Sequence, residues 1–139
     1  MVAVTVLAAA TVGGLVYRSR SGRLTSASVA ADGSAVIPAG LLAEPADGDS
    51  GVTLLHFSSA TCAPCRQVRA VCADLSTTMA GVRHVEIDAD EHLDAARELD
   101  IWRLPTLLVV DRSGRIAQRA VGVPDRAALS AAVSEVLAA

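Results

Sequence analysis

From position 52 onward, apolar residues follow two alternating periods, one typical of strands and one typical of helices. Val52–Phe57 is an apolar run with the length of a buried strand, and residues 65–79 carry apolar side chains at helical spacing. The same pattern continues to residue 137. It predicts strands over 52–57, 82–87, 107–110 and 116–121, and helices over 65–79, 90–99 and 125–137, with Asp90 capping the second helix.

The order of these elements predicts an α/β fold. A strand, a helix and a second strand in succession require a parallel crossover. Asp111–Gly114 reads instead as a tight turn, which pairs the last two strands antiparallel. We therefore expect a mixed central sheet flanked by helices on both faces.

The first seventeen residues form a separate segment. Residues 2–17 carry no charge and are mostly Val, Ala and Leu, and Arg18, Arg20 and Arg23 follow at once. At about 1.5 Å per residue, such a run is just long enough to cross a hydrocarbon core. A signal peptide usually begins with a positive region, which is missing here, and a buried soluble helix is the third interpretation. The pattern favours an N-terminal transmembrane helix.

These boundaries divide the chain into a transmembrane anchor over residues 1–17, a linker over 18–33 and one domain over 34–139. The linker is rich in Ser, Gly and Ala, and Ala35–Ile37 is a candidate first strand. Arginines next to a membrane span stay on the cytoplasmic side. We therefore expect a single-pass protein of the inner (plasma) membrane with its domain in the cytoplasm.

Composition narrows the classes of function. A chain of 139 residues has room for one domain with a sizeable core. Its formal net charge is −3, so it lacks the basic surplus that neutralises a phosphate backbone, and nucleic acid is not an expected partner. It has three cysteines, two of them three residues apart, which is not the pattern of a secreted disulfide framework.

The pair Cys62 and Cys65 carries the candidate chemistry. The pair follows a buried strand and opens a helix, where unpaired backbone N–H groups favour a thiolate at Cys62. Two intervening residues allow a disulfide to close, and Pro64 suits the first helical turn. The other interpretation is half of a zinc site, but Cys72 and His56 are poorly spaced to complete four ligands. We expect a redox pair and no metal, with Cys72 an inert core residue.

Pro105 is a further candidate residue of the site. It precedes a strand after a tight bend, where a cis X-Pro bond is expected. Such a bond leaves the backbone groups of Leu104 free to align an extended substrate segment beside the sulfurs. A Cys62 thiolate would attack a substrate disulfide there, and Cys65 would then resolve the mixed disulfide.

Several motifs, in this order and spacing, resemble the thioredoxin family. They are Leu54–Phe57, Cys62–Arg66, Val85–Asp88, Leu104–Leu107, Asp111–Gly114 and Gly122. The likeness covers about residues 50–139. With the apolar N-terminal run and the segment Phe57–Ser59, the chain is also similar to the bacterial membrane-anchored thioredoxin-like proteins of the ThiX type.

The resemblance implies a thioredoxin fold and a thiol–disulfide oxidoreductase. Its substrates would be disulfides of proteins or small molecules, an unidentified reductase would supply its electrons, and no cofactor is needed. Residues between the cysteines and around the cis bond would form the substrate-binding surface: Ala63, Pro64, Leu104 and Pro105.

The chain departs from the family pattern at the site. Thr61 and Ser58 stand where the family has tryptophans, and we expect Trp102 to supply a replacement contact for substrate. His56 stands where the family has a buried Asp that takes the proton of the second cysteine, and His84 where it has a Lys. Imidazole accepts protons near neutral pH, so we expect His56 to keep that role.

Two other functions stay open at this point. One is an extracytoplasmic disulfide oxidoreductase that acts as an oxidant or isomerase, against which the missing positive N-terminal region speaks. The other is a sulfur carrier that holds a persulfide on Cys62 and passes it to a partner without disulfide turnover. The altered surroundings of His56 and the missing tryptophans keep this second alternative open.

Overall fold

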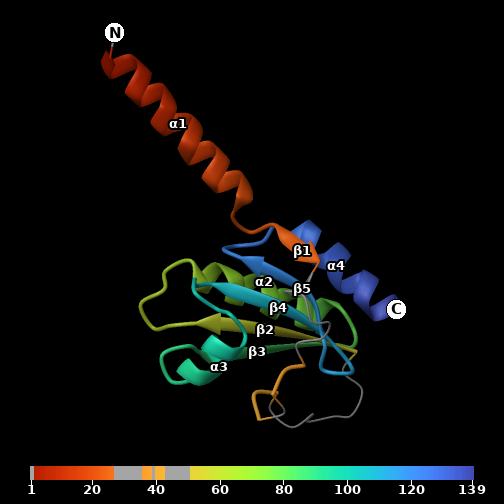
Figure 1. The fold of residues 1–139 in the computed structure, drawn as a ribbon. Helices are drawn as coiled ribbons and strands as arrows, with labels where there is room; N and C mark the ends of the chain where they lie inside the picture. The colour runs from red at the N-terminus through yellow and green to blue at the C-terminus, as the bar shows by residue number, and fades with distance from the viewer. Residues whose placement is uncertain (1, 27–35, 39, 43–50) are drawn as a thin grey trace.

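The structure is a computed structural model that describes residues 2–26, 36–38, 40–42 and 51–139. An α/β domain carries a helix that leads away from it at the N-terminal end (Figure 1). In chain order the elements are α1 Val2–Arg20, β1 Leu24–Ser26, β2 Val52–Ser58, α2 Cys65–Thr78, β3 Val82–Asp88, α3 Leu93–Glu98, β4 Thr106–Asp111, β5 Ile116–Val121 and α4 Arg126–Ala138.

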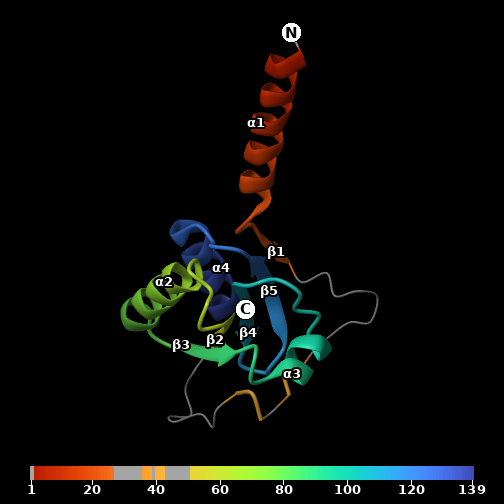
Figure 2. The same ribbon diagram turned by 90° about the vertical axis from the view of Figure 1, so that its left-hand side faces the viewer.

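The strands of the described residues form one sheet in the order β1-β5-β4-β2-β3. β2 runs parallel to β3, with α2 as the crossover between them, and the other neighbours pair antiparallel. Figure 2 shows α2 and α4 on one side of this sheet and α3 on the other. The predicted mixed sheet with helices on both faces is confirmed.

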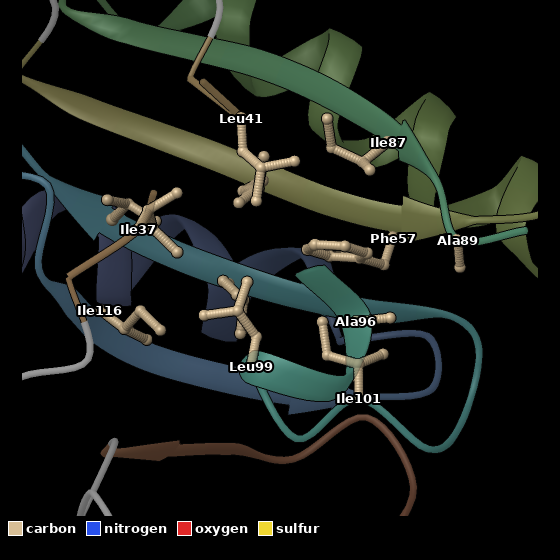
Figure 3. Close-up of a cluster of buried hydrophobic side chains, with 12 residues drawn as sticks. Ile37, Leu41, Phe57, Ile87, Ala89, Ala96, Leu99, Ile101 and Ile116 are labelled. Atoms are coloured by element: carbon tan, nitrogen blue, oxygen red, sulfur yellow. The ribbon is translucent and has the colours of Figure 1, made fainter. Parts of the chain in front are cut away.

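Two hydrophobic clusters pack on the two faces of the sheet. Because both faces are covered, β2 is buried along its whole length. Successive residues of a strand point to opposite faces. Leu54 therefore joins the cluster under α2 and α4, whereas Leu55 and Phe57 join the cluster under α3 (Figure 3). The first cluster takes its buried α2 side chains from one helical stripe, namely Val68, Cys72 and Leu75.

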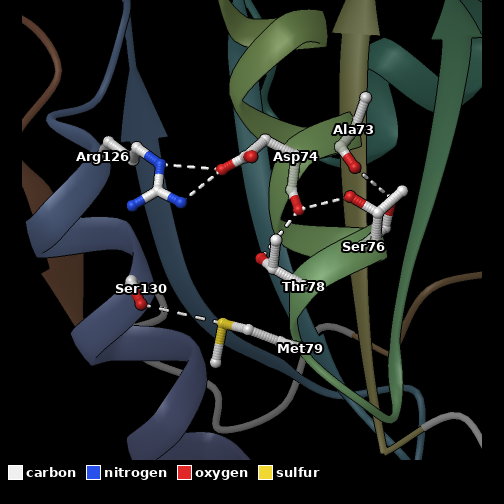
Figure 4. Close-up of polar contacts among 8 residues, drawn as sticks. Ala73, Asp74, Ser76, Thr78, Met79, Arg126 and Ser130 are labelled. Carbon is white, nitrogen blue, oxygen red and sulfur yellow. Dashed lines mark hydrogen bonds and ion pairs between the residues drawn. The ribbon is translucent and has the colours of Figure 1, made fainter.

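A polar contact at the surface joins α4 to α2. Arg126 of α4 donates to the carboxylate of Asp74, with Nε 2.8 Å from Oδ2 (Figure 4). Further along, the Ser130 hydroxyl lies 3.7 Å from the sulfur of Met79. These contacts hold α4 beside the helix that opens with the cysteine motif.

The elements predicted from residue 52 onward are confirmed, with one shorter helix. α3 begins at Leu93, and Asp90 is not its cap. The reason is a turn that ends β3: the Asp88 carboxylate accepts the N–H of Asp90 at 2.9 Å, and the Asp88 carbonyl accepts the N–H of His92 at 3.1 Å. The helix can start only after this turn.

The predicted linker over 18–33 differs from the structure at both of its described parts. Residues 18–20 complete α1, and Leu24–Ser26 form β1, which pairs antiparallel with β5 at one edge of the sheet. A three-residue strand is too short to show a period in the sequence. Residues 27–35 lie outside the described residues, and Val36 makes an isolated bridge to Arg115.

The apolar N-terminal run forms α1, which extends away from the sheet (Figures 1 and 2). Large apolar side chains of this helix, such as Leu7 and Leu15, are exposed. Nowhere in the described part of the chain is a helix both long and apolar enough to cross a membrane. The expected transmembrane anchor over residues 1–17 is therefore not supported. Polar Thr5 and Thr11 and the pair Gly13–Gly14 interrupt the apolar run.

Candidate active site

The two cysteines of the motif are joined in a disulfide at the point where β2 gives way to α2. Residues 59–64 form the connecting turn, in which the Cys62 N–H donates to the Ser59 carbonyl at 3.2 Å and the Cys65 N–H to the Cys62 carbonyl at 3.2 Å. The Cα atoms of the two cysteines are 5.4 Å apart. The turn therefore brings the two sulfurs together, as the spacing predicts.

The two sulfurs differ in access to solvent. Cys62 is half-buried among the exposed residues Thr61, Ala63 and Pro64, whereas Cys65 is 1% exposed. Cys62 also lies in the turn just before the N-terminus of α2, where free N–H groups and the helix dipole favour an anion. Cys62 is therefore the more accessible residue of the pair.

The bond between Leu104 and Pro105 is cis, as predicted. Pro105 is buried, and its carbonyl accepts the N–H of Gly122 at 2.8 Å. Phe57 at the end of β2 pairs with Thr106 at the start of β4. β4 therefore begins at the end of the sheet where β2 leads into the cysteine turn (Figure 1). The cis bond and the disulfide thus lie at the same end of the sheet.

Trp102 stands in the loop that leads to the cis bond. Its side chain is 76% exposed, and its indole N–H donates to the Asp100 carboxylate. Leu104, two residues on, is half-buried. An exposed aromatic side chain therefore lies in the loop that leads to the cis bond, and its contact with substrate stays a prediction.

A carboxylate that the sequence reading missed lies beside the cysteine turn. Glu86 of β3 accepts two hydrogen bonds from Arg69 of α2, at 2.7 Å each, and one from the Ser58 hydroxyl at 2.6 Å. These bonds, Arg69 first, lower the pKa of Glu86 to about 2. The three side chains line an open pocket of about 300 Å³ together with Ser59 and Ala60 of the turn and Asp88.

His56 lies behind this carboxylate, fully buried in β2. Among the described residues neither of its ring nitrogens has a hydrogen-bond partner, although Nδ1 is 4.0 Å from Oε1 of Glu86. Its ring stacks on that of His84, with centroids 5.9 Å apart. Burial is the main cause that lowers the pKa of His56 to about 4, so the imidazole is neutral at neutral pH. It shares the face of Leu54, which α2 covers.

Most of the chain matches the model of one protein family. The model of the thioredoxin family matches residues 45–135 of this chain, which is more than half of it. The chain belongs to the thioredoxin family.

Two known members illustrate the likeness. The chain is 32% identical over 77 residues to thioredoxin H4-1 of Oryza sativa subsp. japonica, a match that covers 55% of this chain and 58% of that protein. It is 27% identical over 86 residues to the thioredoxin of Chlamydia trachomatis, covering 62% and 83%. The chain thus spans little more than half the length of the first of these relatives.

Solved thioredoxin structures share the fold. A mutant thioredoxin from Halobacterium salinarum superposes with a TM-score of 0.57 at 24% identity, covering 65% of this chain and 78% of that one. Thioredoxin from Malassezia sympodialis gives a TM-score of 0.54 at 29% identity, covering 65% and 80%. The expected thioredoxin fold is confirmed.

Cys72, the third cysteine of this thioredoxin-family chain, lies apart from the redox pair. It is a free thiol, 0% exposed, and packs in the cluster under α2. Burial is the main cause that raises its pKa to about 12, so it stays protonated. Within the described ranges, no three His, Cys, Asp or Glu side chains are grouped so that they could hold a metal ion.

Proposed function

We propose that this thioredoxin-family protein is a thiol–disulfide oxidoreductase that reduces disulfides of proteins or small molecules through Cys62 and Cys65. One observation carries the proposal. A half-exposed and a buried cysteine are joined in front of a helix N-terminus, at the end of the sheet where the cis bond before Pro105 lies.

The reaction begins with the reduced pair. The Cys62 thiolate attacks one sulfur of the substrate disulfide, and the other substrate sulfur leaves with the electron pair of the broken bond and takes up a proton. Cys65 then loses its proton and attacks the sulfur of Cys62, which releases the second substrate thiol. Two electrons have moved to the substrate, and a separate reductase returns the Cys62–Cys65 disulfide to the dithiol.

Two groups of neighbouring residues support these steps. We propose that His56 accepts the proton that Cys65 loses, because this imidazole is neutral at neutral pH and lies on the sheet face that α2 covers. We assign substrate alignment to the surface around the cis bond. It comprises Ala63, Pro64, Trp102, Leu104 and Pro105.

The proposed function is tested by insulin reduction with dithiothreitol as the reductant. Cys62→Ser removes the attacking sulfur, so we expect its rate to fall to that of dithiothreitol alone. Cys72→Ala is the matched control, since it also removes one cysteine but leaves the site intact, and it should keep the full rate. Full activity of Cys62→Ser would refute the proposal. Mass spectrometry of the native protein that finds one extra sulfur on Cys62 would instead favour the sulfur carrier.

We also propose that this protein associates with the inner membrane, like the membrane-anchored proteins of the ThiX type that it resembles, and that its domain lies on the cytoplasmic side. The exposed apolar side chains of α1 and the arginines that follow them support association with a bilayer. The test is fractionation of cells that express the whole chain or a chain without residues 1–17. We expect only the whole chain to sediment with membranes, and we expect a cysteine introduced at the exposed residue Glu91 to be protected from an impermeant alkylating reagent in intact cells. A soluble whole chain would contradict the association with a membrane, and labelling of the introduced cysteine would contradict the cytoplasmic side.

A further inference from the structure

Glu86 connects the two flanks of the cysteine turn through one carboxylate. Ser58 is the last residue of β2 before the turn, and its hydroxyl donates to Oε1 at 2.6 Å. Arg69 lies one helical turn after Cys65 in α2 and donates to both oxygens at 2.7 Å. The position of the carboxylate is thus fixed from both elements that hold the disulfide.

The same carboxylate also lies close to a buried imidazole. Oε1 of Glu86 lies 4.0 Å from Nδ1 of His56, and the side chains are 25% and 0% exposed. Three charged or titratable side chains act on His56: Glu86 and His84 from β3, and Arg69 from α2. Its cross-strand neighbour in β4 is the apolar Leu107. Glu86 alone of the three favours a protonated ring, whereas His84 and Arg69 oppose it.

A buried base needs such a charge if it is to take a proton. The neutral ring costs little to bury, but an imidazolium without a counter-charge is strongly disfavoured in an apolar surrounding. The pKa of Glu86 is about 2, so its carboxylate stays ionised at every physiological pH. It also borders the open pocket beside the turn, which connects it to solvent.

We propose that Glu86 is a positioning residue for thiol exchange, whose carboxylate stabilises the His56 imidazolium that forms when Cys65 gives up its proton. This inference rests on the proposed function. In the step, the S–H bond of Cys65 breaks, the proton goes to a ring nitrogen of His56, and the electron pair stays on sulfur. That sulfur bonds to Cys62 while the substrate sulfur leaves with its electron pair. The imidazolium afterwards returns the proton to water.

The test measures the second step by itself. A mixed disulfide between Cys62 and a thiol probe, thionitrobenzoate, is formed on the protein, and release of the probe by Cys65 is followed against pH by its absorbance. In Glu86→Gln the side chain keeps its size but loses its charge. We expect release at pH 7 to slow about tenfold, and the pH midpoint of the His56 ring, followed by NMR, to move lower. Glu86→Asp should restore part of the rate.

Two further variants separate this role from a structural one. In a His56→Leu background, Glu86→Gln should slow release no further. Arg69→Gln removes the cation but keeps the carboxylate, and should move the His56 midpoint to higher pH, which remains measurable if Glu86→Gln folds poorly. The matched control is Asp74→Asn, which removes another ion pair of α2 (Figure 4) and should change neither rate nor midpoint.

Three results would overturn the inference. They are an unchanged His56 midpoint in both Glu86→Gln and Arg69→Gln, an unchanged rate in a folded Glu86→Gln, and an equal slowing by Glu86→Gln with and without His56. None of them is the result that would refute the proposed function, which is full insulin reduction by Cys62→Ser. The two failures are therefore distinguishable.

Discussion

Mild acid is expected to destabilise this protein through one buried side chain, His56. Its pKa is about 4 in the folded protein, against 6.5 for an unperturbed histidine. Between these values the unfolded chain binds a proton that the folded protein excludes. Stability therefore falls as the pH drops below about 6.5, and the loss is complete once the pH passes below about 4.

The magnitude follows from the size of the pKa difference. The pKa of His56 is about 2.5 lower in the folded protein than in the unfolded chain. Since a pKa difference of 1 is worth about 1.4 kcal/mol, this one corresponds to about 3 kcal/mol of folding free energy. About 2 kcal/mol of this is lost between pH 7 and pH 5. Glu86 adds little in this range, because it titrates at lower pH in both states. The lowered pKa of His84 acts in the same direction as that of His56.

Urea unfolding of the oxidised protein, followed by circular dichroism at pH 7 and pH 5, measures the effect. The free energy of unfolding of the wild type should fall by about 2 kcal/mol or more. His56→Leu cannot take up this proton, so its loss should be smaller by about 2 kcal/mol, with the remainder due to His84 and other groups. Equal losses in the two proteins would refute the account of His56 as a buried neutral imidazole.

Other perturbations test the packing. Phe57→Ala should lower the free energy of unfolding by about 3–5 kcal/mol, because the ring is fully buried in the cluster under α3; a loss below about 1 kcal/mol in urea unfolding would contradict that packing. Asp125→Ala removes the cap that accepts the Ala128 N–H at 3.0 Å, and should cost about 1 kcal/mol in the same assay. Cys72 should react with iodoacetamide only after urea unfolds the protein, and labelling of the folded protein at pH 8 would contradict its burial.

The order of elements from residue 52 could be predicted because each carries a clear period. Val52–Phe57 has no polar interruption except Thr53 and His56, and the structure buries the whole strand. The cis bond before Pro105 could be predicted from its place between a bend and an apolar strand. Such features depend on neighbouring residues in the sequence, and local physical rules describe them well.

The features that the sequence did not reveal depend on distant parts of the chain. β1 forms because Leu24–Ser26 pairs with β5, and a three-residue segment carries no sequence pattern that predicts this pairing. The Glu86 contacts require the parallel register that sets Glu86 beside His56, and the approach of Arg69 from α2. The one available signal was the alternation of His84 and Glu86 in a predicted strand, which places both on one face.

We propose that Cys62 and Cys65 form a dithiol–disulfide pair that donates electrons to substrates. The most direct test of this proposal is the reduction potential of this pair, measured in Cys72→Ala so that no third thiol contributes, by equilibration against dithiothreitol and glutathione and counting of alkylated thiols. If the pair acts as a reductant, its potential should lie near about −270 mV, in the range of thioredoxin. A potential near about −120 mV, in the range of a strong oxidant, would contradict the proposal.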